Sequence, residues 1–141
     1  MYKKLPDDFS LICDLRSSTQ FNTSAELLRW IKNSALSNNV HLFKNTLGVP
    51  SGYILWANVN KETLAKIKRS SAFPLHFYEW NEGYITLVLD ILITDGWTAF
   101  NRSQLMSFLR KRKILAYVRD KKLSLLVRKN WLHRKLKILK D

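Results

Sequence analysis

Hydrophobic residues in the first part of the chain recur with helical spacing in two segments, residues 7–16 and 25–36. Phe9, Ile12 and Cys13 share one face of the first segment, whose leading carboxylates suit a helix N-terminus. In the second segment, the positions expected to face inward are Leu27, Leu28, Ile31 and Leu36. The serine just ahead of it is a suitable N-cap. The pattern therefore predicts two amphipathic helices joined by the polar turn SSTQFNTS.

Past the second helix, the apolar positions follow the two-residue period of β-strands, interrupted by further helical segments. The expected strands are residues 39–45, 53–60, 73–80, 84–94, 114–120 and 123–129. Helices are expected over 61–70, after Asn60 as N-cap, and over 104–112, after Ser103. Residues 130–141 have the spacing of a basic amphipathic helix.

The order of these elements predicts the fold class. Short connections, such as NEG at 81–83, favour antiparallel pairing of neighbouring strands. We therefore expect an α+β fold with a mostly antiparallel central sheet flanked by helices. No linker or repeat divides the 141 residues, so we expect a single domain over residues 1–141 that ends in a basic tail from about residue 130.

Positive charge is concentrated toward the C-terminus. Residues 1–100 hold 10 Lys/Arg and 9 Asp/Glu, a net of +1, and residues 101–141 hold 14 and 2, a net of +12, which together give the +13 of the chain. Such a block predicts an acidic partner, which could be an acidic protein, an anionic membrane or nucleic acid. No paired-cysteine finger, RRM-type strand signature or clear helix-turn-helix is recognisable, which disfavours nucleic acid.

Composition also restricts the chemistry and the compartment. Cys13 is the only cysteine, which excludes an intrachain disulfide and a Cys-rich zinc site, and we expect no metal site. No uncharged apolar window reaches the roughly 18 residues of a membrane span. The N-terminus does not read as a secretory signal. We therefore expect a cytoplasmic protein without a transmembrane segment.

Asp90 stands in the middle of the longest predicted strand, YITLVLDILIT. If its side chain points into the core, an unpaired charge would be costly, so the group would shift its pKa or find donors. Alternatively, it faces solvent in a polar stripe with Thr86 and Thr94, which have the same parity in the strand. The pattern leaves both interpretations open.

Two segments, VPSGYILWANVNKE and the later YITLVLDILITDGW, together resemble the toxin-activating lysine acyltransferases, which acylate RTX pore-forming toxins. The resemblance is carried by Pro50, Tyr53, Trp56, Ala57, Asn58, Asp90, Gly96 and the run LMSFLRKR at 105–112, and it covers about residues 10 to 130. It implies a fold similar to that of the GNAT N-acetyltransferases and a catalytic role for Asp90. It also implies no bound cofactor and a very acidic donor, acyl carrier protein.

One position departs from the pattern of that family. The family's catalytic histidine lies in a Ser-x-x-His motif between the first two helices, and the matching loop here, SSTQF, has Gln20, or Phe21 in an adjacent register, in its place. Glutamine cannot take a proton at neutral pH, so it cannot be the general base, although it could hold a substrate carbonyl. The chain's histidines are His41, His76 and His133, and His41 is the candidate for a replacement base.

The end of the predicted helix 104–112 is the candidate for partner binding. Cations suit a helix C-terminus, but the run that starts with Arg110, Lys111 and Arg112 continues well beyond what capping requires. Together with Trp56 and Asn58 on the family-like strand, these are the residues that we expect to bind a substrate or an acidic carrier protein or subunit.

The resemblance implies an acyltransferase that modifies a protein or peptide during toxin maturation. A side branch of the family matures siderophore-carrying microcins, joining an activated siderophore to a peptide's C-terminal serine together with a second protein. The missing histidine implies a partner protein here as well. The first alternative is a non-catalytic binding subunit that recruits the peptide or carrier protein, and the second is a basic nucleic-acid-binding module.

Overall fold

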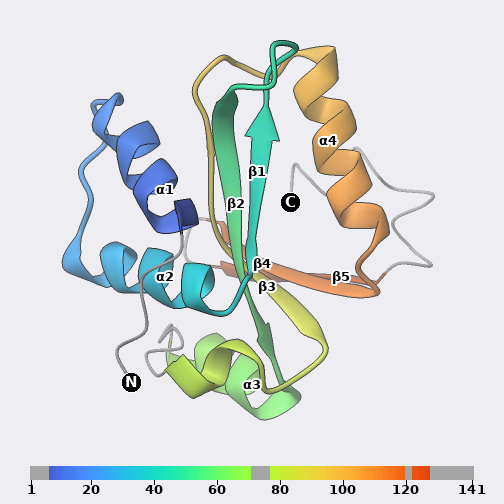
Figure 1. Ribbon diagram of the computed structural model, residues 1–141. Helices are drawn as coiled ribbons and strands as arrows, with labels where there is room; N and C mark the ends of the chain where they lie inside the picture. The colour runs from blue at the N-terminus through green and yellow to red at the C-terminus, as the bar shows by residue number, and fades with distance from the viewer. Residues whose placement is uncertain (1–6, 71–76, 120–121, 128–141) are drawn as a thin grey trace.

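The computed structural model describes residues 7–70, 77–119 and 122–127 and shows helices packed against a central sheet (Figure 1). The helices are α1 (Asp7–Ser17), α2 (Ala25–Leu36), α3 (Lys61–Ser70), the 3₁₀ helix η1 (Phe77–Trp80) and α4 (Ala99–Arg110). The strands are β1 (Val40–Lys44), β2 (Pro50–Val59), β3 (Ile85–Ile93), β4 (Ile114–Arg119) and β5 (Lys122–Val127). The predicted α+β class is confirmed. Within the described ranges, no helix is both long enough and apolar enough to cross a membrane.

The five strands form one sheet in the order of the sequence, β1-β2-β3-β4-β5. Most neighbouring strands are antiparallel, as predicted, but β3 and β4 are parallel. The chain between these two strands contains α4. Parallel neighbours require such a crossover, because a tight turn cannot return the chain to the end of the sheet from which it started. The sheet is therefore mixed.

The helices cover both faces of the sheet, with α1 and α2 on one side and α4 on the other (Figure 1). Successive residues of β2 point to opposite faces of the sheet. Tyr53 and Leu55 belong to the hydrophobic cluster beneath α1 and α2, whereas Ile54 and Trp56 belong to the cluster beneath α4. We refer to these sides as the α1/α2 face and the α4 face.

The first two helices form where the pattern predicts them. Ser24 is the N-cap of α2, and its hydroxyl accepts a hydrogen bond from the N–H of Leu27 at 3.0 Å. Ile31 is fully buried as expected, but Leu28 is 44% exposed, so its inward assignment is wrong. The buried stripe of α2 runs instead through Ile31, Ser34 and Ala35, which turns Leu28 toward solvent.

The end of the strand predicted over residues 73–80 is instead the 3₁₀ helix η1, and residues 73–76 lie outside the described part of the chain. Trp80 explains the difference, because its indole is fully buried and donates from Nε1 to the hydroxyl of Ser34 at 2.9 Å. The predicted hairpin at 81–83 is also absent, since the N–H groups of Glu82 and Gly83 both donate to the carbonyl of Asn58 on β2.

The helix predicted over 104–112 begins five residues earlier, at Ala99, and its N-cap is Thr98 and not Ser103. The Thr98 hydroxyl accepts a hydrogen bond from the N–H of Asn101 at 3.1 Å. The predicted β4–β5 pair is confirmed as antiparallel. The expected turn at 120–122 lies partly, and the expected helix over 130–141 entirely, outside the described residues.

Candidate functional site

A β-bulge decides which face of the sheet Asp90 occupies. Asp90 lies opposite Leu55 and Val88 lies opposite Trp56, so Leu89 is an extra residue in β3. Residues directly opposite each other share a face, and Leu55 belongs to the α1/α2 face. Asp90 therefore points toward α1 and away from α4.

The same bulge excludes the polar stripe considered for Asp90. Thr86 lies opposite Asn58, before the bulge, and is 3% exposed. Asn58 is two residues after Trp56 in β2, so it points to the same face, the α4 face. Thr86 and Asp90 therefore lie on opposite faces of the sheet, although they are an even number of residues apart.

Two side chains from other elements hold Asp90. The Arg16 guanidinium, near the end of α1, forms an ion pair with Oδ2 of Asp90 at 3.3 Å. The Tyr53 hydroxyl on β2 donates to the same oxygen at 2.5 Å, and Arg16 donates to the Tyr53 oxygen at 3.0 Å. The side chains of Arg16 and Asp90 are 8% and 26% exposed, so water and salt screen this pair less than a surface pair. These donors explain how the strand accommodates a carboxylate.

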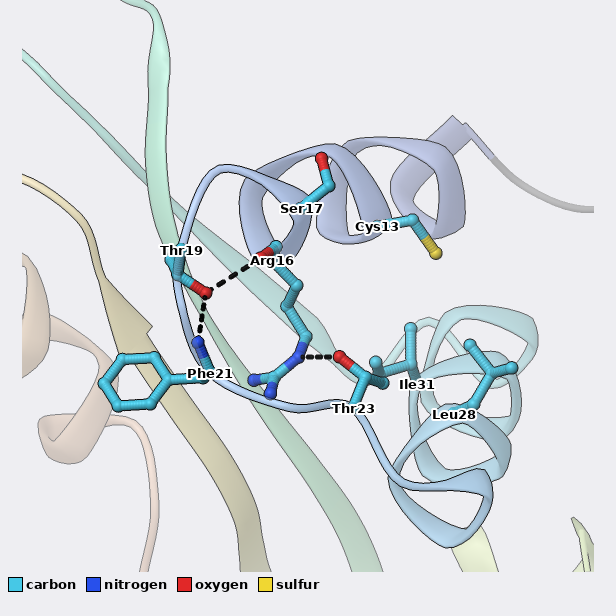
Figure 2. A pocket seen from close by; sticks show the side chains of 8 residues that line it. All are labelled: Cys13, Arg16, Ser17, Thr19, Phe21, Thr23, Leu28 and Ile31. Atoms are coloured by element: carbon cyan, nitrogen blue, oxygen red, sulfur yellow. Dashed lines mark hydrogen bonds between the residues drawn. The ribbon is translucent and has the colours of Figure 1, made fainter.

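Arg16 also fixes the loop that follows α1 (Figure 2). Its Nε donates to the Thr23 hydroxyl at 2.8 Å, and its Nη2 donates to the Asn22 carbonyl at 2.9 Å. The Thr19 hydroxyl donates to the carbonyl of Arg16 at 2.8 Å and accepts from the N–H of Phe21 at 3.3 Å. All three guanidinium nitrogens are thus engaged, and Arg16 ties the SSTQFNTS loop to the sheet.

The environment of Tyr53 keeps its hydroxyl protonated. Burial raises the pKa of Tyr53, and the neighbouring Asp90 carboxylate raises it further. The phenol therefore remains a hydrogen-bond donor at neutral pH. One carboxylate oxygen of Asp90, Oδ2, consequently accepts from two donors, of which one is a cation.

A cavity of about 370 Å³ opens beside the SSTQFNTS loop (Figure 2). It is lined by Cys13, Arg16, Ser17, Thr19, Phe21, Thr23, Leu28 and Ile31. Phe21 is 67% exposed, so part of the apolar wall is open to solvent. Burial and the nearby Asp14 raise the pKa of the Cys13 thiol, which leaves it protonated and a weak nucleophile at neutral pH. The cavity offers a binding surface without an activated nucleophile of its own.

Gln20 does not line this cavity. It is exposed in the loop, between the lining residues Thr19 and Phe21. His76 and His133 lie outside the described residues. His41 is therefore the one histidine whose position can be compared with that of Asp90.

His41 lies on the opposite face of the sheet from Asp90. It is paired with Ile54, which faces α4, and its ring centroid lies 5.3 Å from that of Phe43 and 5.8 Å from that of Phe108. Burial lowers the pKa of His41, and two nearby cations near the end of α4 lower it further. His41 is therefore a neutral, packed side chain, and the structure does not bring it to Asp90.

Most of the residues expected to bind a substrate or partner come together at the C-terminal end of α4. Trp56, Asn58, Lys111 and Arg112 line one cavity of about 400 Å³, which we call the basic pocket. Its other lining residues are Asn39, Tyr84, Thr86 and Lys113. Arg110 is exposed and is not among the lining residues. The basic pocket lies on the α4 face, so the sheet separates it from Asp90.

Sequence reasoning did not identify Arg16, the residue most closely engaged with Asp90. The two are 74 positions apart, and no local pattern joins them. A signal was nevertheless present, because Arg16 ends a predicted helix beside a polar turn, and residues 1–100 contain only three arginines. A carboxylate inside a strand needs hydrogen-bond donors, and the guanidinium of an arginine supplies several at once, so one of these three arginines was a candidate partner for Asp90.

Among the residues that the structure describes, no three His, Cys, Asp or Glu side chains gather as a metal ion would require. Comparison with known proteins gave no match to this chain, either among protein-family models or among curated sequences.

Proposed function

We propose that the protein is a GNAT-like, acyltransferase-like subunit of a system that modifies a peptide or protein in toxin or microcin maturation, and that it needs a second protein for the chemical step. The observation that carries the proposal is the engagement of Asp90 with Arg16 and Tyr53. By the sequence resemblance, Asp90 would correspond to the catalytic acid of the toxin-activating acyltransferases, and its charge is already matched by the Arg16 cation.

Acyl transfer to a lysine amine or a serine hydroxyl requires that the acceptor lose a proton as the new bond forms. Arg16 and Tyr53 both contact Oδ2 of Asp90, so in this arrangement the carboxylate holds Arg16 and, through it, the SSTQFNTS loop. His41, the histidine within the described ranges, faces the other side of the sheet. These placements support a division of labour in which the partner supplies the base. The chain would contribute the fold, the loop and the binding surfaces.

The cavity beside the SSTQFNTS loop is suited to the acyl or siderophore group that is transferred. It combines an apolar part, from Phe21, Leu28 and Ile31, with the hydroxyls of Thr19 and Thr23. Its volume of about 370 Å³ is within the range of small-molecule sites. The donor would be an acyl carrier protein or an activated siderophore, and the basic end of the chain would attract an acidic carrier.

The test is a transfer assay with the cognate peptide, read by the mass of the peptide. The chain is assayed alone and together with the protein encoded beside it, with the charged donor present. We expect no modification by the chain alone and modification by the pair. Turnover by the chain alone would contradict the proposed need for a partner.

The second candidate is a subunit that only binds. The ion pair between Asp90 and Arg16 favours it as well, because a carboxylate engaged by a cation can have a purely structural role. The variant Asp90→Asn, assayed in the pair and checked for folding by circular dichroism, separates the two. Loss of turnover in a folded Asp90→Asn variant would place Asp90 in the chemistry. Turnover at the wild-type rate would assign the chemistry to the partner. The exposed Asp14→Asn variant of α1 is the matched control.

A further inference from the structure

The basic pocket contains three consecutive cations and no carboxylate. Lys111, Arg112 and Lys113 line it together with neutral side chains, among them Asn58, Thr86 and Tyr84. The ion pair between Arg16 and Asp90 lies on the opposite face, and within residues 7–70, 77–119 and 122–127 no salt bridge is found to Lys111, Arg112 or Lys113. No carboxylate of the described residues therefore compensates the three charges through a salt bridge.

Arg112 is the most constrained of the three cations. Its guanidinium lies over the rings of Trp56 and Phe108, at 4.8 Å and 4.5 Å from their centroids. Its Nε is buried and has no hydrogen-bond partner among the described residues. A half-buried cation held by aromatic rings, with an N–H group unused, is costly unless a ligand supplies an acceptor.

The end of α4 does not by itself explain this cluster. A helix C-terminus has the effect of roughly half a negative charge, and one nearby cation is enough to match it. Three cations in one pocket repel each other, and an anion between them would relieve that repulsion. Their field already reaches His41, whose pKa is lowered by burial and then by Lys111 and Arg112.

The shape of the pocket restricts what the anion is attached to. The cavity holds about 400 Å³, which is enough for a small ligand larger than a bare ion. Trp56 is covered, at 7% exposure, whereas Tyr84, which also lines the pocket, is 61% exposed and is the aromatic side chain more accessible to a ligand. The side chains of Asn58 and Thr86 add polar groups to the lining.

We propose that the basic pocket binds a small phosphate monoester with a planar ring, in which Lys111, Arg112 and Lys113 hold the phosphate and the ring stacks on Tyr84. A phosphate dianion fits three cations better than a singly charged carboxylate does, and it accepts hydrogen bonds on several oxygens at once. A ring on Tyr84 would gain from stacking in the way that bases do on aromatic side chains. This site is independent of the proposed acyl-transfer role, because it lies on the other face of the sheet.

The experiment is a calorimetric titration of the full chain with AMP as the probe, compared with adenosine and inorganic phosphate. We expect AMP to bind at least tenfold more tightly than either of them, because only AMP supplies both the phosphate and the ring. Equal affinity for AMP and adenosine would overturn the phosphate site, as would failure to bind AMP. Equal affinity for AMP and inorganic phosphate would overturn the stacked ring.

Variants separate the pocket from the general positive charge of the chain. The double variant Lys111→Gln and Lys113→Gln changes two exposed side chains, and we expect it to lower the affinity for AMP at least tenfold without lowering the melting temperature. The control, Lys32→Gln and Lys61→Gln, removes the same charge at exposed positions on α2 and α3. An equal loss of affinity in the control would contradict a specific pocket.

A last arm tests nucleic acid as the ligand. A single-stranded oligonucleotide of about a dozen nucleotides without a terminal phosphate is titrated at low and at physiological salt. We expect weak binding that does not compete with AMP. Tight binding that displaces AMP and falls steeply with salt would assign the cations to a nucleic-acid surface, and the phosphate monoester proposal would fail.

Discussion

Asp90 meets its partners because of one extra residue in β3. Without the bulge at Leu89, strict alternation would place Asp90 on the α4 face. With it, Asp90 lies opposite Leu55 and faces Arg16 and Tyr53. The alternation of apolar and polar residues could predict that the carboxylate needed donors. It could not predict the face, because a bulge shifts the parity of a strand without changing its composition.

The strength of the Arg16–Asp90 contact can be measured with Asp90→Asn. The change leaves Arg16, which is 8% exposed, without its counter-charge. Because Asp90 itself is partly exposed, we expect a loss of about 2 kcal/mol in the free energy of unfolding, below the value for a fully buried pair. Urea denaturation measures it, and the exposed Asp14→Asn variant should change by less than about 0.5 kcal/mol.

Comparison of Asp90→Asn with Arg16→Met and with the double variant would isolate the pair itself. A double variant that loses as much as the two single variants combined would mean that the two side chains act independently. In that case, the hydrogen bonds from Arg16 to Thr23 and Asn22 would hold the SSTQFNTS loop without help from Asp90.

The raised pKa of Tyr53 leads to a prediction about stability at alkaline pH. Its pKa is raised in the folded state by burial and by Asp90, whereas an unfolded tyrosine has a pKa of about 10. Above that pH, the unfolded chain loses a proton that the folded protein keeps. The contribution of Tyr53 to stability is therefore complete below about pH 10 and falls by about 1.4 kcal/mol per pH unit above it.

The measurement is the free energy of unfolding of the wild type and of Tyr53→Phe at about pH 9 and about pH 11. We expect the wild type to lose more stability between the two than the variant does, because phenylalanine has no proton to lose. Lysines and the other tyrosines are common to both proteins and cancel in the difference. Parallel pH profiles would show that Tyr53 ionises normally when folded.

Among the elements, α4 shows what the hydrophobic pattern does and does not detect. Its apolar positions Leu105, Phe108 and Leu109 are buried, and they placed a helix in this region. Its first turn has no such signal, since Phe100 is 46% exposed. The buried side chain of that turn is Asn101, which donates to the carbonyl of Gly96 at 2.7 Å. Polar anchoring of this kind has no periodicity, so the start of the helix was placed too late.

The two candidate N-caps of α4 give a matched pair of variants. Thr98→Ala removes the hydroxyl that accepts from the N–H of Asn101, and we expect it to cost about 1 kcal/mol of stability. Ser103 lies exposed inside the helix, so Ser103→Ala should be neutral or slightly stabilising. Thermal or urea unfolding of both variants measures the difference. Equal effects would contradict the observed start of the helix.

In the molecule as a whole, the sheet separates two sites of different character. The α1/α2 face carries the Arg16–Asp90 ion pair, the SSTQFNTS loop held by Arg16 and a partly apolar cavity. The α4 face carries the basic pocket, whose cations form no salt bridge with the described residues. The sequence predicted that Trp56, Asn58 and the basic run would serve binding, and the fold brings most of them together. It could not predict that His41 and Asp90 would be on opposite sides, because that depends on the register between β1, β2 and β3.

This separation leads to a prediction about coupling. Sites without shared partners contribute independently, and no side chain of the Arg16–Asp90–Tyr53 cluster lines the basic pocket. We therefore expect Asp90→Asn to leave the affinity for AMP within about twofold of the wild type, provided that the variant is folded. Conversely, adding Lys111→Gln and Lys113→Gln to Asp90→Asn should give stability changes that sum to within about 0.5 kcal/mol. Calorimetry and urea unfolding of the four proteins complete the cycle. A tenfold loss of AMP affinity in folded Asp90→Asn would instead mean that β2, which carries both Tyr53 and Trp56, transmits strain between the faces.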